Sequence, residues 1–376
     1  MAPPSPTAEQ VLAALRPIVD PDFGRSIVDL GFVKNLAIEG GRVAFDIELT
    51  TPACPVKAEF ERAARERVAA LPGVTEVAVR MTANTRGRAA ARSGAEGAAA
   101  QPQGAVLPGV RNVLAVASGK GGVGKSTVAI NLALALRETG ATVGVLDADV
   151  YGPSLPLLTG VSGRPETRER RILPHQAYGL ELMSMGFFLT EGSPVIWRGP
   201  MVHGLVRQFL TDVEWGELDY LVVDLPPGTG DAALTLTQQA PLSGAVIVTT
   251  ANDLSLIDAR KGLAMFEKVS VPVLGIVENL SYFVPPDLPD RRYYIFGQGG
   301  GERVARELGI EFLGEVPIDP RVVEGGDIGK PILVYAPEAP PAVALRGIAG
   351  TVARKLAVLA ESAPKIADAN ITWVSS

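Results

Sequence analysis

Residues 119–127 read Gly-Lys-Gly-Gly-Val-Gly-Lys-Ser-Thr, and this stretch decides the fold of the chain. The apolar run 113–117 before it is typical of a buried strand, and residues 128–137 after it have apolar side chains at helical spacing. Glycines between a strand and a helix let successive backbone N–H groups approach one phosphate, and the helix adds the positive end of its dipole. This context disfavours a glycine-rich turn that binds nothing. The predicted nucleotide contacts are Gly119, Lys120, Gly121, Gly122, Val123, Gly124, Lys125, Ser126 and Thr127.

Two lysines in this stretch have different predicted roles, and both are expected to be catalytic. Lys125 is expected on the β- and γ-phosphates of ATP, and the hydroxyl of Ser126 on Mg²⁺. Lys120 is an additional lysine that an ordinary nucleotide-binding loop does not require. It narrows the prediction from nucleotide binding in general to one branch of the P-loop ATPases.

Length and composition fit an enzyme with two domains. The 376 residues exceed one ordinary core, and 47% hydrophobic with 20% charged residues supports a large α/β core. The net charge of −6 disfavours nucleic acid as a partner. No apolar stretch reaches the roughly 18 residues of a membrane span, and the amino terminus lacks signal-peptide features, so we expect a cytoplasmic protein without a membrane partner. The single cysteine, Cys54, excludes an intrachain disulfide and a tetrathiolate metal site within one chain.

Hydrophobic patterning divides the chain into a small domain, a linker, a large domain and a tail. The predicted segments are a small α+β domain at 1–83, a flexible linker at 84–108, a P-loop ATPase domain at 109–362 and a carboxyl-terminal tail at 363–376. In the small domain we expect helices at 8–19 and 56–70 and strands at 42–49 and 74–81. In the large domain we expect strands at 113–117, 143–147, 220–224, 245–249 and 273–277, and a last helix at 341–359. Strands that alternate with helical stretches predict an α/β fold with a parallel sheet covered by helices and ligands at the carboxyl ends of the strands.

Two of the predicted strands end in carboxylates that suit an ATPase site. Residues 143–149 end in Asp147 and Asp149, and we assign Asp149 to the attacking water or the water shell of the metal, with Asp147 as a structural residue. A solvated acidic turn is the alternative. Residues 221–224 end in Asp224, which is expected near Mg²⁺, and the loop after it places Gly228 where its N–H can contact the γ-phosphate. The alternative there is a proline-rich turn.

Two further residues have predictions that the residues alone leave open. Asn279 follows a predicted strand and is interpreted either as a partner of the adenine edge or as a turn residue. Cys54 stands before a predicted helix, whose amino terminus favours thiolate chemistry, although a single thiol is more often a small buried apolar residue.

Several motifs together resemble one family. They are residues 119–127, 147–154 (Asp-Ala-Asp-Val-Tyr-Gly-Pro-Ser), 197–200 (Trp-Arg-Gly-Pro), 215–221, 224–231 (Asp-Leu-Pro-Pro-Gly-Thr-Gly-Asp) and 295–297 (Ile-Phe-Gly). These resemble the Mrp/ApbC-type iron–sulfur cluster carrier ATPases, which belong to the deviant-Walker group with MinD, ParA and the nitrogenase iron protein. Residues 20–22, 26–31 and 50–55 resemble the small iron–sulfur assembly domain often fused to these carriers. The resemblance implies ATP hydrolysis in a homodimer, Lys120 reaching the nucleotide of the partner subunit, and cluster transfer to apo-proteins or exchange with assembly scaffolds.

The sequence departs from that family at the cluster site. Carriers of this type have a Cys-x-x-Cys pair after the segment that corresponds to 279–283, and here those two positions hold Pro285 and Leu288. Neither residue binds iron, and a dimer of this chain offers two thiolates, both from Cys54, where an iron–sulfur cluster normally takes four. Three functions stay open: an iron–sulfur assembly ATPase that works through Cys54, transient clusters or the cysteines of a partner, a MinD/ParA-like dimerisation switch, and a nucleotide-binding scaffold without turnover. We favour the first, because its motifs cover both domains.

Overall fold

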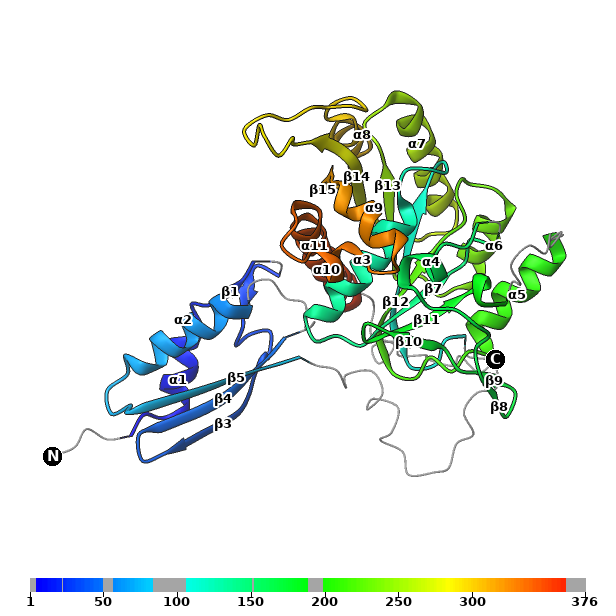
Figure 1. Cartoon of the computed structure of the whole chain (residues 1–376). Coiled ribbons are helices and arrows are strands. Elements are labelled where there is room, and N and C mark those ends of the chain that lie inside the picture. Colours follow the sequence, from blue (N-terminus) through cyan, green and yellow to red (C-terminus); the bar gives the residue numbers. More distant parts are fainter. Residues whose placement is uncertain are drawn as a thin grey trace, which may run out of the picture. The chain divides into compact units, whose positions relative to one another are not determined.

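The computed structural model describes residues 5–21, 23–49, 57–83, 106–150, 152–188 and 199–362 (Figure 1). The chain divides into two compact units, residues 1–84 with 354–376 and residues 85–353, and each is described by itself. The boundaries predicted from the sequence at residues 83, 108 and 362 stay predictions.

The small unit is an α+β unit with a mixed sheet. Its elements are α1 (Ala8–Leu15), β1 (Val19–Asp20), β2 (Arg25–Ser26), β3 (Val33–Glu39), β4 (Arg42–Leu49), α2 (Lys57–Ala69) and β5 (Glu76–Ala83). The main sheet has the order β3-β4-β5, in which β4 pairs antiparallel with β3 and parallel with β5. Thr7 and Gln10 form a reciprocal capping box that starts α1. The core is formed by alternate residues of β4 and one stripe of each helix, including Val43, Ile47 and Phe60.

The large unit holds the predicted strand–loop–helix stretch. Its strands are β6 (Val110–Ser118), β7 (Val143–Asp147), β8 (Thr167–Arg168), β9 (Arg171–Ile172), β10 (His175–Ala177), β11 (Leu180–Ser184), β12 (Leu218–Asp224), β13 (Gly244–Thr249), β14 (Val273–Phe283) and β15 (Phe312–Ile318). Its helices are α3 (Lys125–Glu138), α4 (Leu155–Thr159), the 3₁₀ helix η2 (Met185–Phe188), α5 (Gly199–Thr211), α6 (Asp231–Gln239), α7 (Asp253–Lys268), α8 (Gly300–Leu308), α9 (Pro320–Asp327), α10 (Ile332–Tyr335) and α11 (Pro340–Ser362).

Within the described residues the large sheet has the strand order β10-β11-β7-β12-β6-β13-β14-β15. Only β10 is antiparallel to its neighbour, and the strands from β11 to β15 all run parallel. The chain leaves β6 in one direction to reach β7 and later continues on the other side of β6 through β13 and β14. The order therefore reverses beside β6, and ligands in such sheets bind at this switch point, outside the carboxyl ends of the strands.

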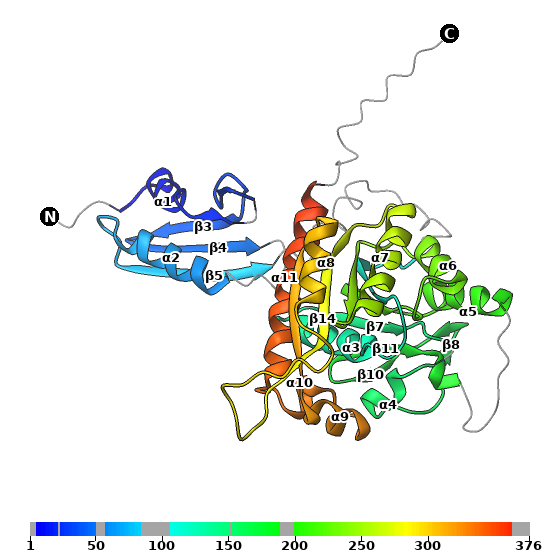
Figure 2. The ribbon, with the colours of Figure 1, turned by 90° about the horizontal axis from the view of Figure 1, so that it is seen from above.

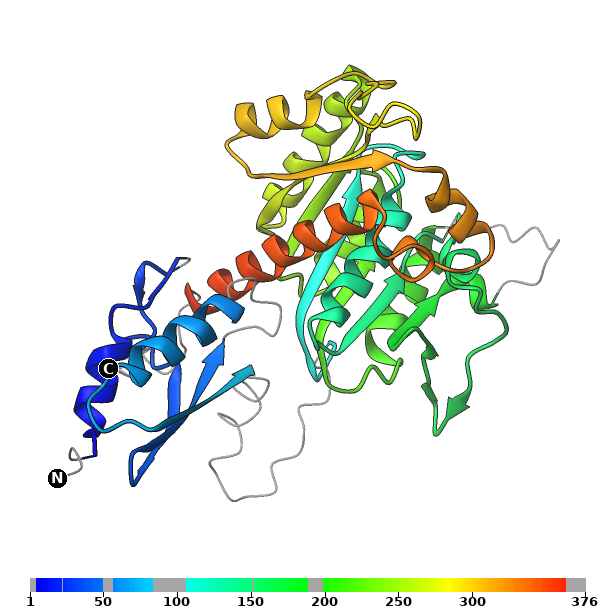
Figure 3. The ribbon, with the colours of Figure 1, turned by 60° about the vertical axis from the view of Figure 1, so that its left-hand side comes forward.

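Helices cover both faces of this sheet (Figures 2 and 3). The α3 helix packs under β7, β12 and β6, with α10 beside it, and Arg346 of α11 pairs with Glu138 at the end of α3. The α7 and α8 helices pack against β13 and β14 and against each other on the opposite face, which follows from right-handed crossovers that leave β6 in two directions. Strands β7, β12 and β13 are buried along their whole length, as expected for a parallel sheet covered on both sides.

The sequence-based fold class is confirmed, with corrections to single elements. The predicted strand 143–147 coincides with β7, and the other four predicted strands of the large unit fall within β6, β12, β13 and β14. Two predicted boundaries were wrong. The helix expected at 8–19 ends at Leu15, and Val19 lies in β1. The β14 strand does not end before Glu278 and Asn279 but continues through them to Phe283. Polar side chains can lie inside this buried strand because each is hydrogen-bonded. Among the described helices, none is both long and apolar enough to cross a membrane.

Candidate functional site

The phosphate-binding stretch forms the predicted loop between β6 and α3. Gly122 and Gly124 have φ values of +83° and +78°, a region that side chains disfavour, and Gly124 is the N-cap residue immediately before α3. A Cβ on Gly119 would come within 2.3 Å of the backbone of Asp258 in α7. The hydroxyl of Ser118 donates to the carbonyl of Lys120 at 2.9 Å. The glycines are therefore required by backbone conformation and by close packing, as a loop that wraps a phosphate needs.

The side chain of Asn279 holds the backbone of this loop by a hydrogen bond. Its Nδ2 donates to the carbonyl oxygen of Val123 at 2.8 Å, and the side chain is 5% exposed. A Cβ on Gly124 would lie 2.2 Å from the same Nδ2 atom. In this structure the amide of Asn279 therefore holds the loop backbone, and a contact with adenine stays a prediction.

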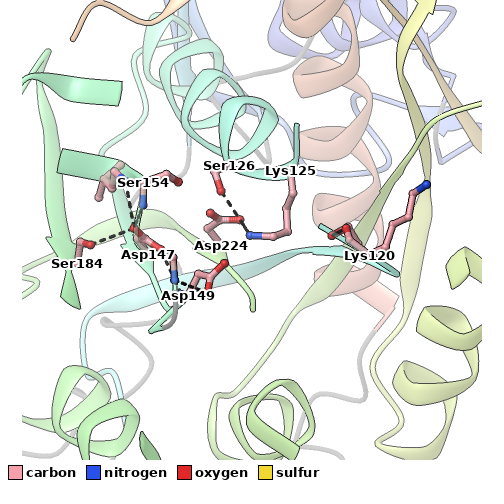
Figure 4. Close-up of polar contacts among 11 residues, drawn as sticks. Lys120, Lys125, Ser126, Asp147, Asp149, Ser154, Ser184 and Asp224 are labelled. Carbon is pink, nitrogen blue, oxygen red and sulfur yellow. Dashed lines mark hydrogen bonds and ion pairs between the residues drawn. The ribbon is translucent and has the colours of Figure 1, made fainter. Parts of the chain in front are cut away.

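Lys125 and Asp224 form a buried ion pair at the centre of the site (Figure 4). Lys125 Nζ lies 2.5 Å from Asp224 Oδ1, and the two side chains are 6% and 2% exposed. Burial raises the pKa of Asp224, an effect that the ammonium of Lys125 and a hydrogen bond from Ser126 partly offset. Lys125 Nζ also lies 3.4 Å from Ser126 Oγ. The predicted phosphate lysine, metal-binding hydroxyl and strand-end carboxylate are thus adjacent.

Asp147 and Asp149 have different surroundings, because the carboxylate of Asp147 is enclosed by hydrogen-bond donors of the protein. Its carboxylate accepts hydrogen bonds from the backbone N–H groups of Asp149, Ser154 and Leu155 and from the hydroxyl of Ser184, at 2.9 to 3.1 Å. Burial, together with the negative charge of Asp224, raises the pKa of Asp147 to about 7, although the hydrogen bonds from Leu155 and Ser184 oppose the shift. Asp147 therefore organises the loop that follows β7.

Asp149 lies in that loop, beside the ion pair. It is 9% exposed and accepts a hydrogen bond from the N–H of Gly152 at 3.2 Å, and its charge contributes to the raised pKa of Asp224. Figure 4 shows Asp149 below Asp147, on the side that faces Asp224. This position suits a carboxylate that contacts a water of the site, and the role itself stays a prediction.

Gly228 and Lys120 are predicted phosphate contacts whose N–H group and side chain, respectively, have other directions in this structure. The N–H of Gly228 donates to the carbonyl of Ser118 at 2.8 Å, so contact with a γ-phosphate requires this loop to rearrange. The side chain of Lys120 is partly exposed and is directed away from Lys125 and Asp224 in Figure 4.

The site fits Mg²⁺ together with a nucleotide, but not a metal alone. Asp147, Asp149 and Asp224 are close enough to influence one another electrostatically, against the single ammonium of Lys125. Across the described ranges, no three His, Cys, Asp or Glu side chains are grouped so that they could hold a metal ion by themselves. Mg²⁺ usually binds through one or two protein oxygens, nucleotide phosphates and waters, and the hydroxyl of Ser126 beside Asp224 matches that donor set.

Sequence reasoning missed Ser184, a structural residue beside the site that holds the carboxylate of Asp147. It ends β11, the strand next to β7, where its register partner is Asp147. The short run Leu180–Ser184 was not recognised as a strand because Glu181 interrupts its apolar character. A run that ends in serine, like the strands that end in aspartate, was the signal that could have identified it.

Comparison with known proteins decides which P-loop proteins this chain belongs with. Residues 109–353 match the family model described as NUBPL iron-transfer P-loop NTPase (ParA), and residues 8–79 match the iron–sulfur cluster assembly protein family. The chain belongs to the iron-transfer P-loop NTPases.

Similar proteins support this membership over nearly the whole chain. The iron–sulfur cluster carrier protein of Synechocystis sp. is 49% identical over 365 residues, 94% of this chain and 99% of the relative. The protein of the same name from Deinococcus radiodurans is 45% identical, over 93% of this chain and 96% of its own length. A nucleotide-binding protein from Archaeoglobus fulgidus, solved in complex with ADP, is 42% identical with a TM-score of 0.55, over 62% of this chain and 91% of its own length.

In this iron-transfer NTPase the expected cysteine positions lie on an exposed turn. Phe283 and Tyr293 exchange backbone hydrogen bonds of 2.9 and 2.8 Å and close a loop between them. Within it the N–H of Leu288 donates to the carbonyl of Pro285 at 3.1 Å, and Leu288 is 40% exposed. The predicted iron ligand Cys54 lies outside the described residues.

Proposed function

We propose that this chain is an ATP-driven carrier that transfers iron–sulfur clusters to apo-proteins as a homodimer. The observation that carries the proposal is the match of both parts of the chain, residues 8–79 and 109–353, to iron–sulfur assembly and iron-transfer families. A relative named iron–sulfur cluster carrier protein, 49% identical along 94% of the chain, supports it. A cytoplasmic location stays a prediction.

The nucleotide chemistry follows from the charges in the site. The N–H groups of residues 119–127 and the ammonium of Lys125 would hold the β- and γ-phosphates, and Ser126 with Asp224 would hold Mg²⁺ and its waters. Bound Mg²⁺ would supply neutralising charge on the phosphate oxygens. Asp149 would orient the attacking water. With phosphates bound, Lys125 would exchange part of its contact with Asp224 for the nucleotide, and the carboxylate of Asp224 would then be available to the metal and its waters.

Lys120 provides the link from nucleotide to dimer. Its side chain is directed away from the ion pair of its own subunit, which suits a contact with the nucleotide of the partner subunit. Lys120→Ala is expected to leave nucleotide affinity of the monomer unchanged and to weaken ATP-dependent dimerisation about tenfold, because one charge-assisted contact across the interface is lost.

Analytical ultracentrifugation with a non-hydrolysable ATP analogue measures this effect. Lys268 is an exposed lysine at the carboxyl end of α7 and serves as the control. Lys268→Ala also removes one positive charge, and the variant is expected to dimerise as the unmodified protein does. Dimerisation of Lys120→Ala at the level of the unmodified protein would contradict the cross-subunit role.

Cys54 is the thiolate that this chain itself offers to a cluster. Anaerobic reconstitution with iron and sulfide is expected to produce a visible charge-transfer band that Cys54→Ser removes, because no other cysteine exists in the chain. The measurement is the absorption spectrum with iron and sulfide quantitation. A band that persists in the serine variant would show that Cys54 is not the ligand, and no band in either protein would favour a dimerisation switch or a cluster held by a partner.

The turn at Pro285 and Leu288 offers a matched gain-of-function control. Pro285→Cys with Leu288→Cys, in the Cys54→Ser background, places two thiols three residues apart on the exposed turn. A dimer of this variant offers four thiolates, two from the same turn of each subunit, and four is the usual number for a [4Fe–4S] cluster. A band in this variant would show that the reconstitution itself works.

A further inference from the structure

The hydroxyl of Ser154 is a buried polar group whose hydrogen bonds the fold does not explain. Its Oγ is shielded from solvent and has no hydrogen-bond partner among the described residues. The backbone N–H of the same residue is used, since it donates to Asp147 Oδ2 at 3.0 Å. Buried hydroxyls are nearly always paired, because an unsatisfied one loses its hydration without replacement. The unpaired hydroxyl of Ser154 is an exception to this rule and therefore needs a physical explanation.

Ser184 contacts the same carboxylate and shows what a structural serine looks like here. Its Oγ donates to Asp147 Oδ2 at 2.9 Å and accepts from the N–H of Gly186 at 3.0 Å. Both hydrogen-bonding capacities of that hydroxyl are therefore used within the protein. Of Ser154 and Ser184, only Ser154 has a hydroxyl oxygen without a hydrogen-bond partner in the part of the chain that the structure describes.

The two serines lie on different sides of Asp147. Ser184 is the register partner of Asp147 on β11, away from the phosphate-binding loop, whereas Asp224 is its register partner on β12, next to β6. Ser154 belongs to the loop that leaves the carboxyl end of β7 and also carries Asp149. Figure 4 shows Ser154 above Asp147, with its hydroxyl directed toward Ser126, and Asp149 below Asp147, on the side of Asp224. The unpaired hydroxyl thus borders the edge at which Ser126, Lys125 and Asp224 meet.

A water bound to Mg²⁺ would supply the hydrogen-bond partner that this hydroxyl lacks. Mg²⁺ in nucleotide sites keeps several waters, and each needs acceptors in the protein for its hydrogens. A serine oxygen accepts such a hydrogen bond and can turn its own proton to a neighbouring oxygen. We propose that Ser154 is a positioning residue of the Mg²⁺–nucleotide site, whose hydroxyl accepts a hydrogen bond from a water bound to Mg²⁺. This inference rests on the proposed use of Mg²⁺ with ATP and adds to it a group from the loop that carries Asp149.

The test compares Ser154→Ala with Ser184→Ala in the full chain and uses two measurements besides activity. The first is thermal unfolding of the nucleotide-free protein. Ser154→Ala removes an unpaired buried oxygen and is expected to leave the melting temperature unchanged or to raise it, whereas Ser184→Ala removes two hydrogen bonds and is expected to lower it.

The second measurement is the affinity for a fluorescent ADP analogue (mant-ADP) as Mg²⁺ is titrated. Ser154→Ala is expected to bind the analogue as the unmodified protein does in EDTA, within twofold, and to need about five- to tenfold more Mg²⁺ for the metal-dependent gain in affinity. Ser184→Ala is expected to keep its Mg²⁺ midpoint within twofold.

An unchanged Mg²⁺ midpoint in Ser154→Ala would overturn the inference, whatever the melting temperature does. A melting temperature that falls as far as that of Ser184→Ala, with the same midpoint, would identify Ser154 as a structural residue. If the unmodified protein shows no dependence on Mg²⁺, the proposed function itself fails. That outcome is distinct from a failure of the inference about Ser154.

Discussion

Lys125→Ala is expected to abolish ATP hydrolysis, with a loss of at least 100-fold, and to destabilise the protein. Removing one positive group aimed at the transferred phosphate typically costs a factor of about 10² to 10³ in turnover. The same substitution leaves the carboxylate of Asp224 buried, at 2% exposure, without its cation. Breaking a buried pair in this way costs about 3–5 kcal/mol, less to the extent that Asp224 takes up a proton. Burial already raises the pKa of Asp224, which favours that uptake.

A double variant separates the folding effect from the chemical one. Lys125→Ala with Asp224→Asn removes both charges, so the free energy of unfolding is expected to recover part of the loss. Phosphate release from ATP should stay at background in both variants, because the phosphate lysine is absent from both. Chemical denaturation and a steady-state ATPase assay on the same preparations measure the two quantities. Turnover within tenfold of the unmodified protein in Lys125→Ala would refute the assignment of Lys125.

The order of the elements could be predicted because each strand of the central sheet is a continuous apolar run. Strands such as β7 and β12 are buried on both faces, so their sequences need no alternation and stand out from the amphipathic helices between them. The edge strands β10 and β15 were missed for the opposite reason, since their partly exposed residues mix polar and apolar types. Spacing also predicted which residues gather at the carboxyl edge, because parallel strands bring their ends together.

The partners of these side chains could not be predicted, because they depend on contacts between distant segments. Asn279 and Val123 are 156 residues apart, and only the fold brings the amide to the loop carbonyl. The same is true of Gly228, whose N–H meets the carbonyl of Ser118. A motif predicts which group is present at an edge of the sheet, whereas the direction in which it points depends on the packing of the neighbouring strands.

Gly124→Ala is expected to reduce nucleotide affinity at least 100-fold and to destabilise the protein. The φ of +78° at this position costs a residue with a Cβ about 1–2 kcal/mol. The new methyl group would also lie 2.2 Å from Asn279 Nδ2, so the amide must leave the Val123 carbonyl that it holds. An unsatisfied buried carbonyl adds about 1–3 kcal/mol. The loop would therefore lose its conformation and its support together.

Two further variants divide this effect into its parts. Gly121→Ala is the matched control for stability of the nucleotide-free protein, because a Cβ there meets nothing within 4 Å and its backbone φ lies outside the left-handed region. It is expected to unfold at the same denaturant concentration as the unmodified protein. The double variant Gly124→Ala with Asn279→Ala removes the collision but keeps the backbone strain and the loss of support. Its loss of unfolding free energy should therefore be smaller than the sum of the losses in the two single variants.

Isothermal titration with ADP and urea denaturation are carried out on the unmodified protein, Gly124→Ala, Asn279→Ala and the double variant. Together these four proteins give the coupling free energy between residues 124 and 279. Strict additivity of the two substitutions would mean that Gly124 is required by its backbone conformation alone, and that the contact with Asn279 adjusts without cost. A coupling of about 1 kcal/mol or more, with affinity still low in the double variant, would show that Asn279 holds the loop in the conformation that a phosphate needs. Because β14 carries Asn279 and continues to the turn with Pro285 and Leu288, this strand would then connect the phosphate loop directly to that turn.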